Sequence, residues 1–570
     1  MTDLRRLFEQ ELRALQEEGE RFARDFPEAA RFLDPASLDD RDPYVERITE
    51  AMAYLTGRLR EVMDEADRDQ DDANLAMLAP DLVQPLPSVS VVQFMSTHPK
   101  QDSLTIPAGA MVRSEPVEGA PEGIPFRLLH PVPLTSMRVA SAALSETEKV
   151  GASLELKLAW TSQRGNHGWP DSLRFFLYGD APMTWALRYA LRHRVVGTEI
   201  WRGGNWRRAA LPFSLPVLPN YTTENDMALP LTEARDFLCS DERFRFVELR
   251  GIASLGLTTK HTLRLRFHLA GPLPRGLARA VSAEAFRLHA GVVVNRSAEE
   301  LPGVVWDHTR HELPIRPFGG SHREILQLTS VRGFDLPQMR PERKYRPYTS
   351  HDASDPTAGT FHLARRIGTD GQLRTFLGLG NSPDFSQDLT SQSLALTGVC
   401  GDGDHPQRFL AAEQISRPGS DLPTDLGVRG LVRPGPCCRM PDGAVGSMLS
   451  ALMQGHAHGW LDAARLKDGL RHVLWDRAEA KRNLIETIHE IQVADATILV
   501  QGVAWRHRQV TIRLRDTTCT PETWDRLGLL DAFGSVLWTF VKNATPLGSR
   551  SSLRVTIDPA GSTHEYGDTP

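Results

Sequence analysis

The chain has 570 residues, 41% of them hydrophobic and 24% charged, and a formal net charge of −6 at pH 7. A chain of this length is too long for a single hydrophobic core, so we expect two to four domains. Its ordinary composition excludes a disordered chain and a disulfide scaffold. The near-neutral balance argues against nucleic-acid binding, because phosphate-binding surfaces are usually concentrated and basic.

The first predicted element is an amphipathic helix close to the N-terminus. Apolar side chains recur there at helical spacing until Pro27 closes the segment. They are Leu4, Leu7, Phe8, Leu12, Leu15, Phe22 and Phe26.

A second helix is predicted to begin at Pro43, with Asp42 as its N-cap. Its apolar side chains follow one another at alternating steps of three and four, which places them on one stripe of the kind that helix bundles bury. We call this set the seam: Val45, Ile48, Met52, Leu55, Leu59 and Val62. Burying six such groups is worth roughly 1.5–3 kcal/mol each, so we expect another surface to cover the seam.

Two surfaces could bury the seam. The two helices could cover each other as a hairpin, or a partner subunit could bind there. Residues 1–75 hold 21 Asp or Glu against 11 Arg, a net charge of −10, so the remainder of the chain is +4. An acidic helical arm ahead of a β-rich body is typical of an assembly element. The predicted partner-binding residues are therefore the seam together with Leu4, Leu7, Phe8, Leu12 and Leu15.

After Phe94 the hydrophobic pattern changes from helical to alternating, which predicts a β-rich region. The middle of the chain is also expected to hold a hairpin with a Gly203-Gly204 turn and helices that begin near Ala181 and Thr232. Strands are predicted at residues 104–106, 126–129, 154–160, 173–178, 244–249, 263–269, 361–367, 373–379 and 393–399, and a loop at 419–438.

The last third is predicted to be helical and then to end as strand, helix and strand. Two amphipathic helices are expected at residues 464–474 and 484–491, and strands at 510–515 and 553–557. Between these strands Thr520 is predicted to cap a helix, with Pro521 in its first turn. Its apolar stripe is better explained as domain core than as an interface. The stripe consists of Trp524, Leu527, Leu530, Phe533, Leu537 and Phe540.

Several segments together resemble the TssF family, the baseplate wedge subunits of the bacterial type VI secretion system. The strongest match is the N-terminal run of Leu7–Leu12, Phe22-Ala23, Phe26-Pro27, Asp42–Arg47, Ala53–Thr56, Pro87-Ser88 and Val91–Phe94. A second match covers 291–334, and the strand–helix–strand end is also similar. The run at 67–72 stands where the family has a Phe-rich link into a third helix.

The resemblance implies a mechanical role. TssF-like subunits pair with each other, as two copies per wedge, and assemble with TssG, TssK and TssE-like subunits around the spike (VgrG) hub and below the sheath. It implies a cytoplasmic protein docked at the membrane within the baseplate complex, and no catalysis. Two alternatives remain: a wedge subunit of another phage-tail-like contractile injection system, or a cytosolic β-rich hydrolase.

No motif for chemistry is complete. His489-Glu490 begins like a zinc protease signature but has Val493 where the second His is needed. Cys437 and Cys438 are adjacent, with His456 and His458 at an unusual spacing, so zinc is not favoured there. Asp402–His405 starts like a calcium loop and then meets Pro406, which favours a plain turn. We therefore predict no catalytic, metal or cofactor site.

Targeting and redox signals agree with an intracellular location. The N-terminus lacks an apolar signal core, and no apolar run approaches the ~18 residues of a membrane span, so neither export nor membrane insertion is expected. The five cysteines form an odd, scattered set that fits a reducing cytosol. They are Cys239, Cys400, Cys437, Cys438 and Cys519.

The predicted fold class is α+β and multidomain. We expect a helical arm at 1–94, a first β-rich domain at 95–270, a second at 271–440, and a helical, then mixed α/β, C-terminal domain at 441–570.

Overall fold

The structure is a computed structural model that describes residues 2–26, 43–96, 103–146, 151–160, 169–222, 229–257, 262–307, 309–335, 343–348, 359–368, 372–380, 391–423, 425–441, 443–475, 478–500, 503–546 and 548–567. The chain divides into two compact units, residues 1–77 and 78–570. Each unit is described by itself below.

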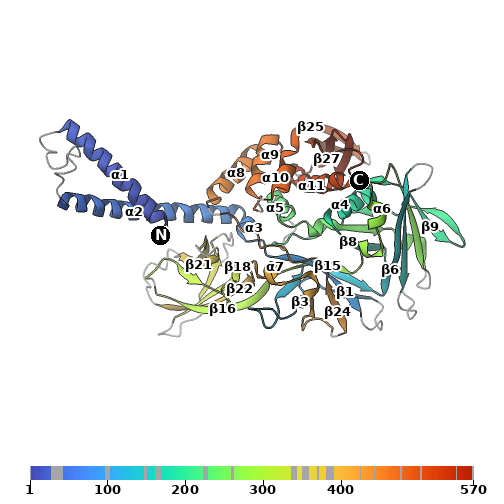
Figure 1. Cartoon of the computed structure of the whole chain (residues 1–570), viewed down its shortest axis with the longest axis horizontal. Helices are drawn as coiled ribbons and strands as arrows, with labels where there is room; N and C mark the ends of the chain where they lie inside the picture. Colours follow the sequence, from blue (N-terminus) through green and yellow to red (C-terminus); the bar gives the residue numbers. More distant parts are fainter. Residues whose placement is uncertain are drawn as a thin grey trace. The chain divides into compact units, whose positions relative to one another are not determined.

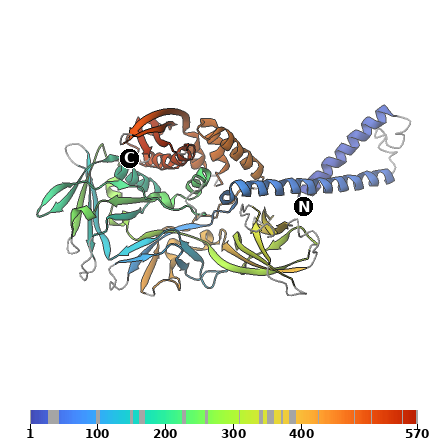
Figure 2. The same ribbon diagram turned by 180° about the vertical axis from the view of Figure 1, so that it is seen from behind.

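The first unit consists of two helices, α1 (Thr2–Asp25) and α2 (Pro43–Leu78). Pro43 is the first residue of α2, as predicted, whereas the expected cap Asp42 and the expected stop Pro27 lie outside the described residues. The two helices cross near the N-terminal end of α1 and diverge from there (Figures 1 and 2). Helix α2 continues through residues 67–72, because that run contains no Gly or Pro to end it.

The second unit is built mainly from β-sheets, and its first sheet joins strands that are far apart in sequence. Strand β1 lies between β15 and β24 and is antiparallel to both, with Val91 opposite Val292 and Phe94 opposite Val428. The sheet order is β23-β3-β4-β15-β1-β24, for Ile415–Pro418, Met111–Ser114, Pro125–Leu128, Ala290–Val294, Val89–Ser96 and Leu426–Gly430.

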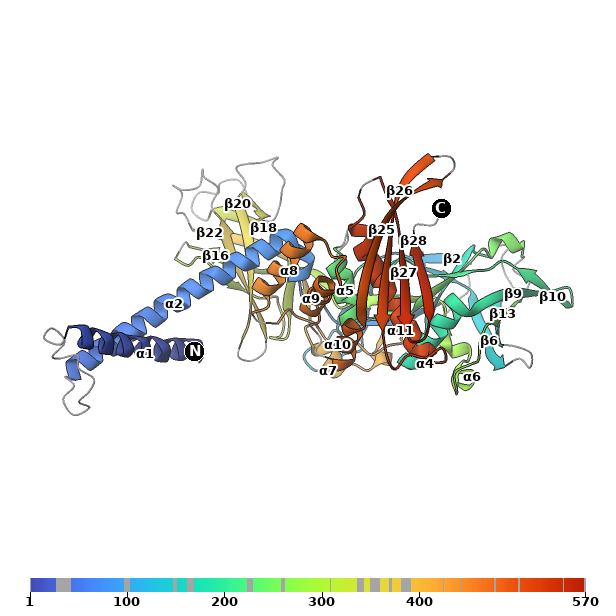
Figure 3. The same cartoon turned by 90° about the horizontal axis from the view of Figure 1, so that it is seen from above.

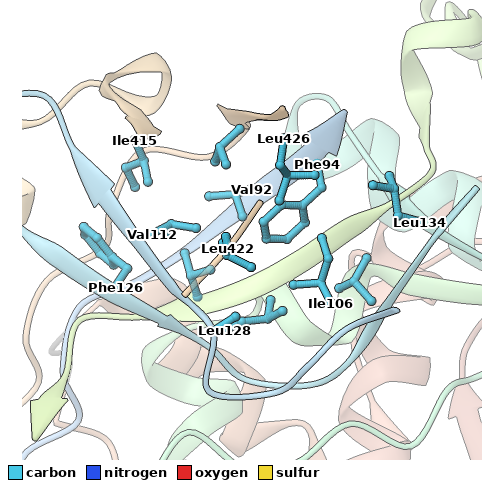
Figure 4. Close-up of a cluster of buried hydrophobic side chains, with 14 of the residues drawn as sticks. Val92, Phe94, Ile106, Val112, Phe126, Leu128, Leu134, Ile415, Leu422 and Leu426 are labelled. Carbon is cyan, nitrogen blue, oxygen red and sulfur yellow. The ribbon is translucent and has the colours of Figure 1, made fainter. Parts of the chain in front are cut away.

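One face of this sheet carries a hydrophobic core. Val92 and Phe94 on β1 point to the same face, since side chains alternate along a strand, and both are fully buried. Figure 4 shows them with neighbours from the other strands and from the pair β2–β5 (Ser103–Ile106, Val132–Thr135). The neighbours include Ile106, Val112, Phe126, Leu128, Leu134, Ile415, Leu422 and Leu426.

Two smaller sheets follow the alternating patterns in the sequence. Along β13 the odd residues are buried and the even ones are partly exposed, and Leu154, Leu156 and Leu158 on β7 are buried in the same way. The five-stranded sheet has the order β10-β9-β13-β7-β6, for Asn205–Ala209, Val195–Arg202, Leu263–Leu269, Ala152–Trp160 and Met137–Glu146. The four-stranded sheet has the order β11-β12-β8-β14, for Phe213–Ser214, Phe246–Arg250, Ser172–Leu177 and Phe286–Arg287.

The β9–β10 hairpin confirms the predicted glycine turn. Gly203 and Gly204 both have positive φ, 61° and 88°, which a two-residue hairpin turn requires and which glycine adopts without strain. The predicted strand at 244–249 is shorter than expected, since residues 242–245 form a 3-10 turn before β12 begins.

A seven-stranded sheet encloses its own core, which includes Trp306, Leu328, Phe361, Leu377 and Leu396. Its order is β16-β22-β18-β19-β20-β21-β17, for Ser297–Trp306, Gln392–Gly401, Glu324–Asp335, Arg343–Pro347, Gly359–Ile367, Leu373–Gly380 and Leu313–Ile315.

The chain ends in a four-stranded sheet against which helix α11 (Trp524–Asn543) packs, as Figure 3 shows. The order is β25-β26-β27-β28, for Ile488–Val500, Val503–Arg515, Arg550–Asp558 and Ser562–Gly567. Strands β26 and β27 are parallel, so α11 is the crossover between them. All six predicted stripe residues of α11 are fully buried, which confirms that they are core.

The remaining helices are short and lie within the second unit. They are α3 (Pro80–Val83), α4 (Ala181–Tyr189) with the π-helical turn η1 (Ala190–Arg194), α5 (Pro230–Cys239), α6 (Leu277–Ala280), α7 (His405–Phe409), α8 (Val445–His458), α9 (Ala463–His472) and α10 (Glu479–Glu486).

Three local predictions are wrong. The segment 419–438 is not only loop, because β24 forms within it by backbone pairing with β1. The predicted helix 484–491 ends at Glu486, and Ile488 begins β25, so its apolar residues are divided between two elements. Thr520 does not cap α11, which begins four residues later at Trp524, because residues 516–523 form hydrogen-bonded turns.

The fold is α+β and multidomain, as predicted. The six-stranded sheet takes strands from residues assigned to three of the four expected domains, whereas the seven-stranded sheet lies within 297–401. The four-part division itself stays a prediction.

Candidate partner-binding surface

The seam lies on the side of α2 that faces away from α1. An α-helix turns about 100° per residue, which places the centre of the seam about 150° around the axis from Ala53 and Gly57. Those two small residues form the contact with α1: Ala53 is fully buried, and a Cβ on Gly57 would lie 3.2 Å from the backbone nitrogen of Phe8. Small residues therefore allow the helices to touch on one side, while the seam stays on the other.

The seam side chains are strongly exposed in the chain. Their exposed fractions are 61% for Ile48, 52% for Met52, 65% for Leu55, 60% for Leu59 and 49% for Val62, and the side chain of Val45 lies outside the described residues. Single exposed apolar residues are normal, whereas a continuous stripe of this kind is typical of interaction surfaces.

The predicted residues of α1 have a different environment. Leu7 is only 5% exposed, and Leu4, Phe8, Leu12 and Leu15 are half-buried. An ion pair joins the two helices where Arg60 Nη1 donates to Glu11 Oε1 at 2.6 Å. The structure thus brings part of α1 against α2, and it does not bring the α1 residues together with the seam.

Sequence reasoning omitted two exposed side chains that extend the seam. Met63 is 60% exposed and lies next to Val62, and Tyr44 is 75% exposed at the start of α2. The ideal helical period places both within about 50° of the seam centre. A helical projection of the sequence would have found them.

The second unit contains a group of buried charged side chains around Asp531. Asp531 of α11 is fully buried and accepts hydrogen bonds from Arg188 of α4, Arg192 of η1 at 2.9 Å and the Tyr566 hydroxyl of β28 at 2.7 Å. His193 Nε2 lies 2.7 Å from Asp531 Oδ1, and the His193 and His564 rings stack at 4.1 Å. We call these six residues the Asp531 cluster.

The electrostatics of the Asp531 cluster are those of a structural ion-pair network. Burial alone would raise the pKa of the Asp531 carboxyl, but Arg192 and Arg188 outweigh burial and hold that pKa well below its ordinary value. Burial lowers the pKa of His193 in spite of its carboxylate partner. The cluster ties α4 and η1 to α11 and β28.

The Asp531 cluster also contains the one set of three potential metal ligands found among the described residues, His193, Asp531 and His564, whose ligand atoms lie within 4.8 Å of one another. The donor set does not fit a cation, because two guanidinium groups already occupy the same carboxylate and would repel it.

The motif residues named from the sequence fall in structural surroundings. His489-Glu490 lies on strand β25, not on a helix. The Asp402 carboxylate accepts from Asn295 Nδ2 at 2.8 Å and Arg323 Nε at 3.2 Å, within a turn in which Gly403 has φ 54°. All five cysteines are buried and unbridged, Cys437 and Cys438 included, and the His458 side chain lies outside the described residues.

These observations define a multidomain α+β protein whose N-terminal helical unit exposes an uncovered apolar stripe. No described helix is long and apolar enough to cross a membrane. The family model "Type VI secretion system, TssF" matches residues 1–566. The chain therefore belongs to the TssF family of the type VI secretion system.

Individual relatives agree with this family. The chain is 34% identical over 277 residues to the type VI secretion system component TssF1 of Pseudomonas aeruginosa, an alignment that covers 43% of each protein, so less than half the length of that relative is matched. It is similar in fold to a chain of the type VI TssK-TssF-TssG baseplate subcomplex, with a TM-score of 0.74, 21% identity, and coverage of 92% of this chain and 98% of the other. A chain of the type VI baseplate complex matches with a TM-score of 0.57, 20% identity, and coverage of 100% and 98%.

Proposed function

We propose that this chain is a structural wedge subunit of the type VI secretion baseplate and works as a mechanical link with no catalytic step. The family match over residues 1–566 supports the machine, and the uncovered seam on α2 supports assembly as the role. The uncovered seam is the observation that carries the proposal, because five exposed apolar side chains in one row need a cover that α1 does not provide.

The proposed partners are a TssG-like subunit at the seam, then TssK-like and TssE-like subunits, with the assembled wedge around the spike hub and joined to the sheath. One structure of similar fold comes from a subcomplex that contains TssK and TssG, and the other comes from a type VI baseplate complex. Two copies of this chain per wedge and a cytoplasmic location at the membrane-docked baseplate belong to the same proposal.

Coexpression of the full chain with a TssG-like partner, purified through a tag on the partner, tests this function. Mass measurement of the complex is expected to give two copies of this chain per partner. The proposal would be contradicted if the chain co-purified with no baseplate partner, or if it turned over a substrate.

The seam is tested in the same system by the double substitution Met52→Asp and Leu55→Asp. More than half of each side chain is still exposed, so each would gain about 1–2 kcal/mol on burial, and each desolvated carboxylate adds a further penalty of several kcal/mol. We expect complete loss of co-purification, because a sum of even about 6 kcal/mol weakens the affinity by a factor of about 10⁴ when each 1.4 kcal/mol is a factor of ten.

Arg13→Asp is the matched control for this variant. Arg13 is exposed on α1, and the substitution changes the net charge by the same two units away from the seam. The control is expected to co-purify normally, and thermal unfolding of the β-rich unit is expected to be unchanged in both variants. Normal co-purification of the Met52/Leu55 variant would remove the seam from the interface.

A further inference from the structure

The acidic residues of the helical unit are not distributed evenly around α2. The helix has four acidic side chains between Tyr44 and Asp64, and at about 100° per residue all four fall on the half that contains Ala53 and Gly57. They are Glu46, Glu50, Glu61 and Asp64. Glu61 and Asp64 are partly buried on the α1 side. The net negative charge of the unit therefore does not describe the surface beside the seam.

One border of the seam is basic instead. Arg47 and Arg58 are both exposed and lie about 90–110° around the helix axis from the seam centre. They are eleven residues apart, which places them nearly on one line along the helix. The spacing corresponds to three turns, about 16 Å along the axis. Arg58 also pairs with Glu61 and is still 57% exposed, so its guanidinium can reach a second carboxylate.

The opposite border carries Thr49 and Thr56, and its basic residue, Arg60, already donates to Glu11 of α1. Charge at the borders of an apolar stripe sets partner choice and orientation in helix–helix assembly, because unlike charges pair across the seam edge and like charges repel.

We infer that the partner of the seam is an amphipathic helix that carries carboxylate groups along one edge, about three turns apart, opposite Arg47 and Arg58. This inference rests on the proposed function and adds to it the chemistry of the partner. It is the reverse of what the net charge of residues 1–75 indicates, which is a basic partner.

The test compares two charge reversals of equal size in the full chain, each measured for affinity to the TssG-like partner at 50 and 300 mM salt. Arg47→Glu with Arg58→Glu is expected to weaken binding about tenfold or more at low salt, and high salt is expected to restore part of the affinity by screening the new repulsion. Glu46→Lys with Glu50→Lys, on the far half of α2, is expected to change the affinity by less than twofold.

The opposite ranking would overturn the inference. If the Glu46/Glu50 variant weakens binding and the Arg47/Arg58 variant does not, the partner edge is basic and the net charge of the unit governs docking. The variant Arg47→Gln with Arg58→Gln is expected to give an intermediate loss, and far-UV circular dichroism checks that α2 still forms, since Arg, Gln and Glu have similar helix propensities.

The outcomes also separate this inference from the proposed function. A wild-type complex that tolerates the Arg47/Arg58 reversal within twofold overturns the charged border alone. The absence of any wild-type complex with baseplate partners overturns the proposed function and the border with it.

Discussion

Replacement of Asp531 by Asn is expected to loosen the contact between α4 and α11. Asn cannot carry the negative charge that balances Arg188 and Arg192, and Arg188 is only 1% exposed. Removal of one partner from a buried ion pair costs about 3–5 kcal/mol, because the other charge stays buried without compensation. The whole stability of a domain is about 5–15 kcal/mol, so this loss is large.

Hydrogen exchange followed by mass spectrometry on peptides from α4 and α11 measures the effect locally. A loss of 3–5 kcal/mol corresponds to exchange roughly 100- to 5,000-fold faster where opening of the contact governs exchange. Asp525→Asn is the matched control, because Asp525 is exposed on the same helix. It is expected to cost less than about 1 kcal/mol, from the helix dipole alone. Unchanged protection in the Asp531 variant, within about 1 kcal/mol, would refute the assignment of the cluster as the tie between these helices.

Two further predictions concern buried groups in the second unit. Gly528→Ala is expected to destabilise the chain by about 1–3 kcal/mol in chemical unfolding, since the added Cβ would lie 2.0 Å from the carbonyl oxygen of Trp185 in α4. Gly19→Ala is the control, because a Cβ there would have nothing within 4 Å, and it is expected to be neutral or stabilising. Burial lowers the pKa of His130 and of His289 to about 4. The unfolded state therefore binds protons below about pH 6.5 that the folded state does not bind until about pH 4. We expect the urea midpoint to decrease as the pH is lowered from about 6.5 to about 4. His289→Asn, which tolerates the positive φ of 58°, is expected to flatten that fall, and an equal slope in the variant would contradict the role of His289.

The sequence predicted elements best where one periodic pattern filled a whole element. The alternation in β13 and the apolar stripe of α11 each belong to one strand or helix, and both were found. The helix predicted at 484–491 was wrong because the end of α10 and the start of β25 share one apolar run, and hydrophobic periodicity alone does not show where the helix ends and the strand begins. Strand β24 was missed because backbone pairing to β1 holds it, and a short side-chain pattern does not reveal such pairing.

The candidate site was predicted in part. The seam follows from spacing within one helix, so its residues were identified, and their exposure agrees with an uncovered stripe; partner binding there stays a prediction. The contact between α1 and α2 through Ala53 and Gly57 was not predicted, because it depends on small residues that hydrophobic patterns ignore. The Asp531 cluster had one visible signal, an acidic residue inside the apolar stripe of α11, but its partners Arg188, Arg192 and His193 come from about 340 positions earlier in the chain.

The place of β1 between β15 and β24 also sets an order of events during synthesis. Val92 lies opposite Gly430, which leaves the ribosome 338 residues after it. At about 5–20 residues per second this interval is roughly 17–70 s. During that time the nascent chain already contains α1 and α2, whereas β1 still lacks its neighbour β24. A subunit that recognises those helices can therefore engage them before the remainder of the protein has finished folding.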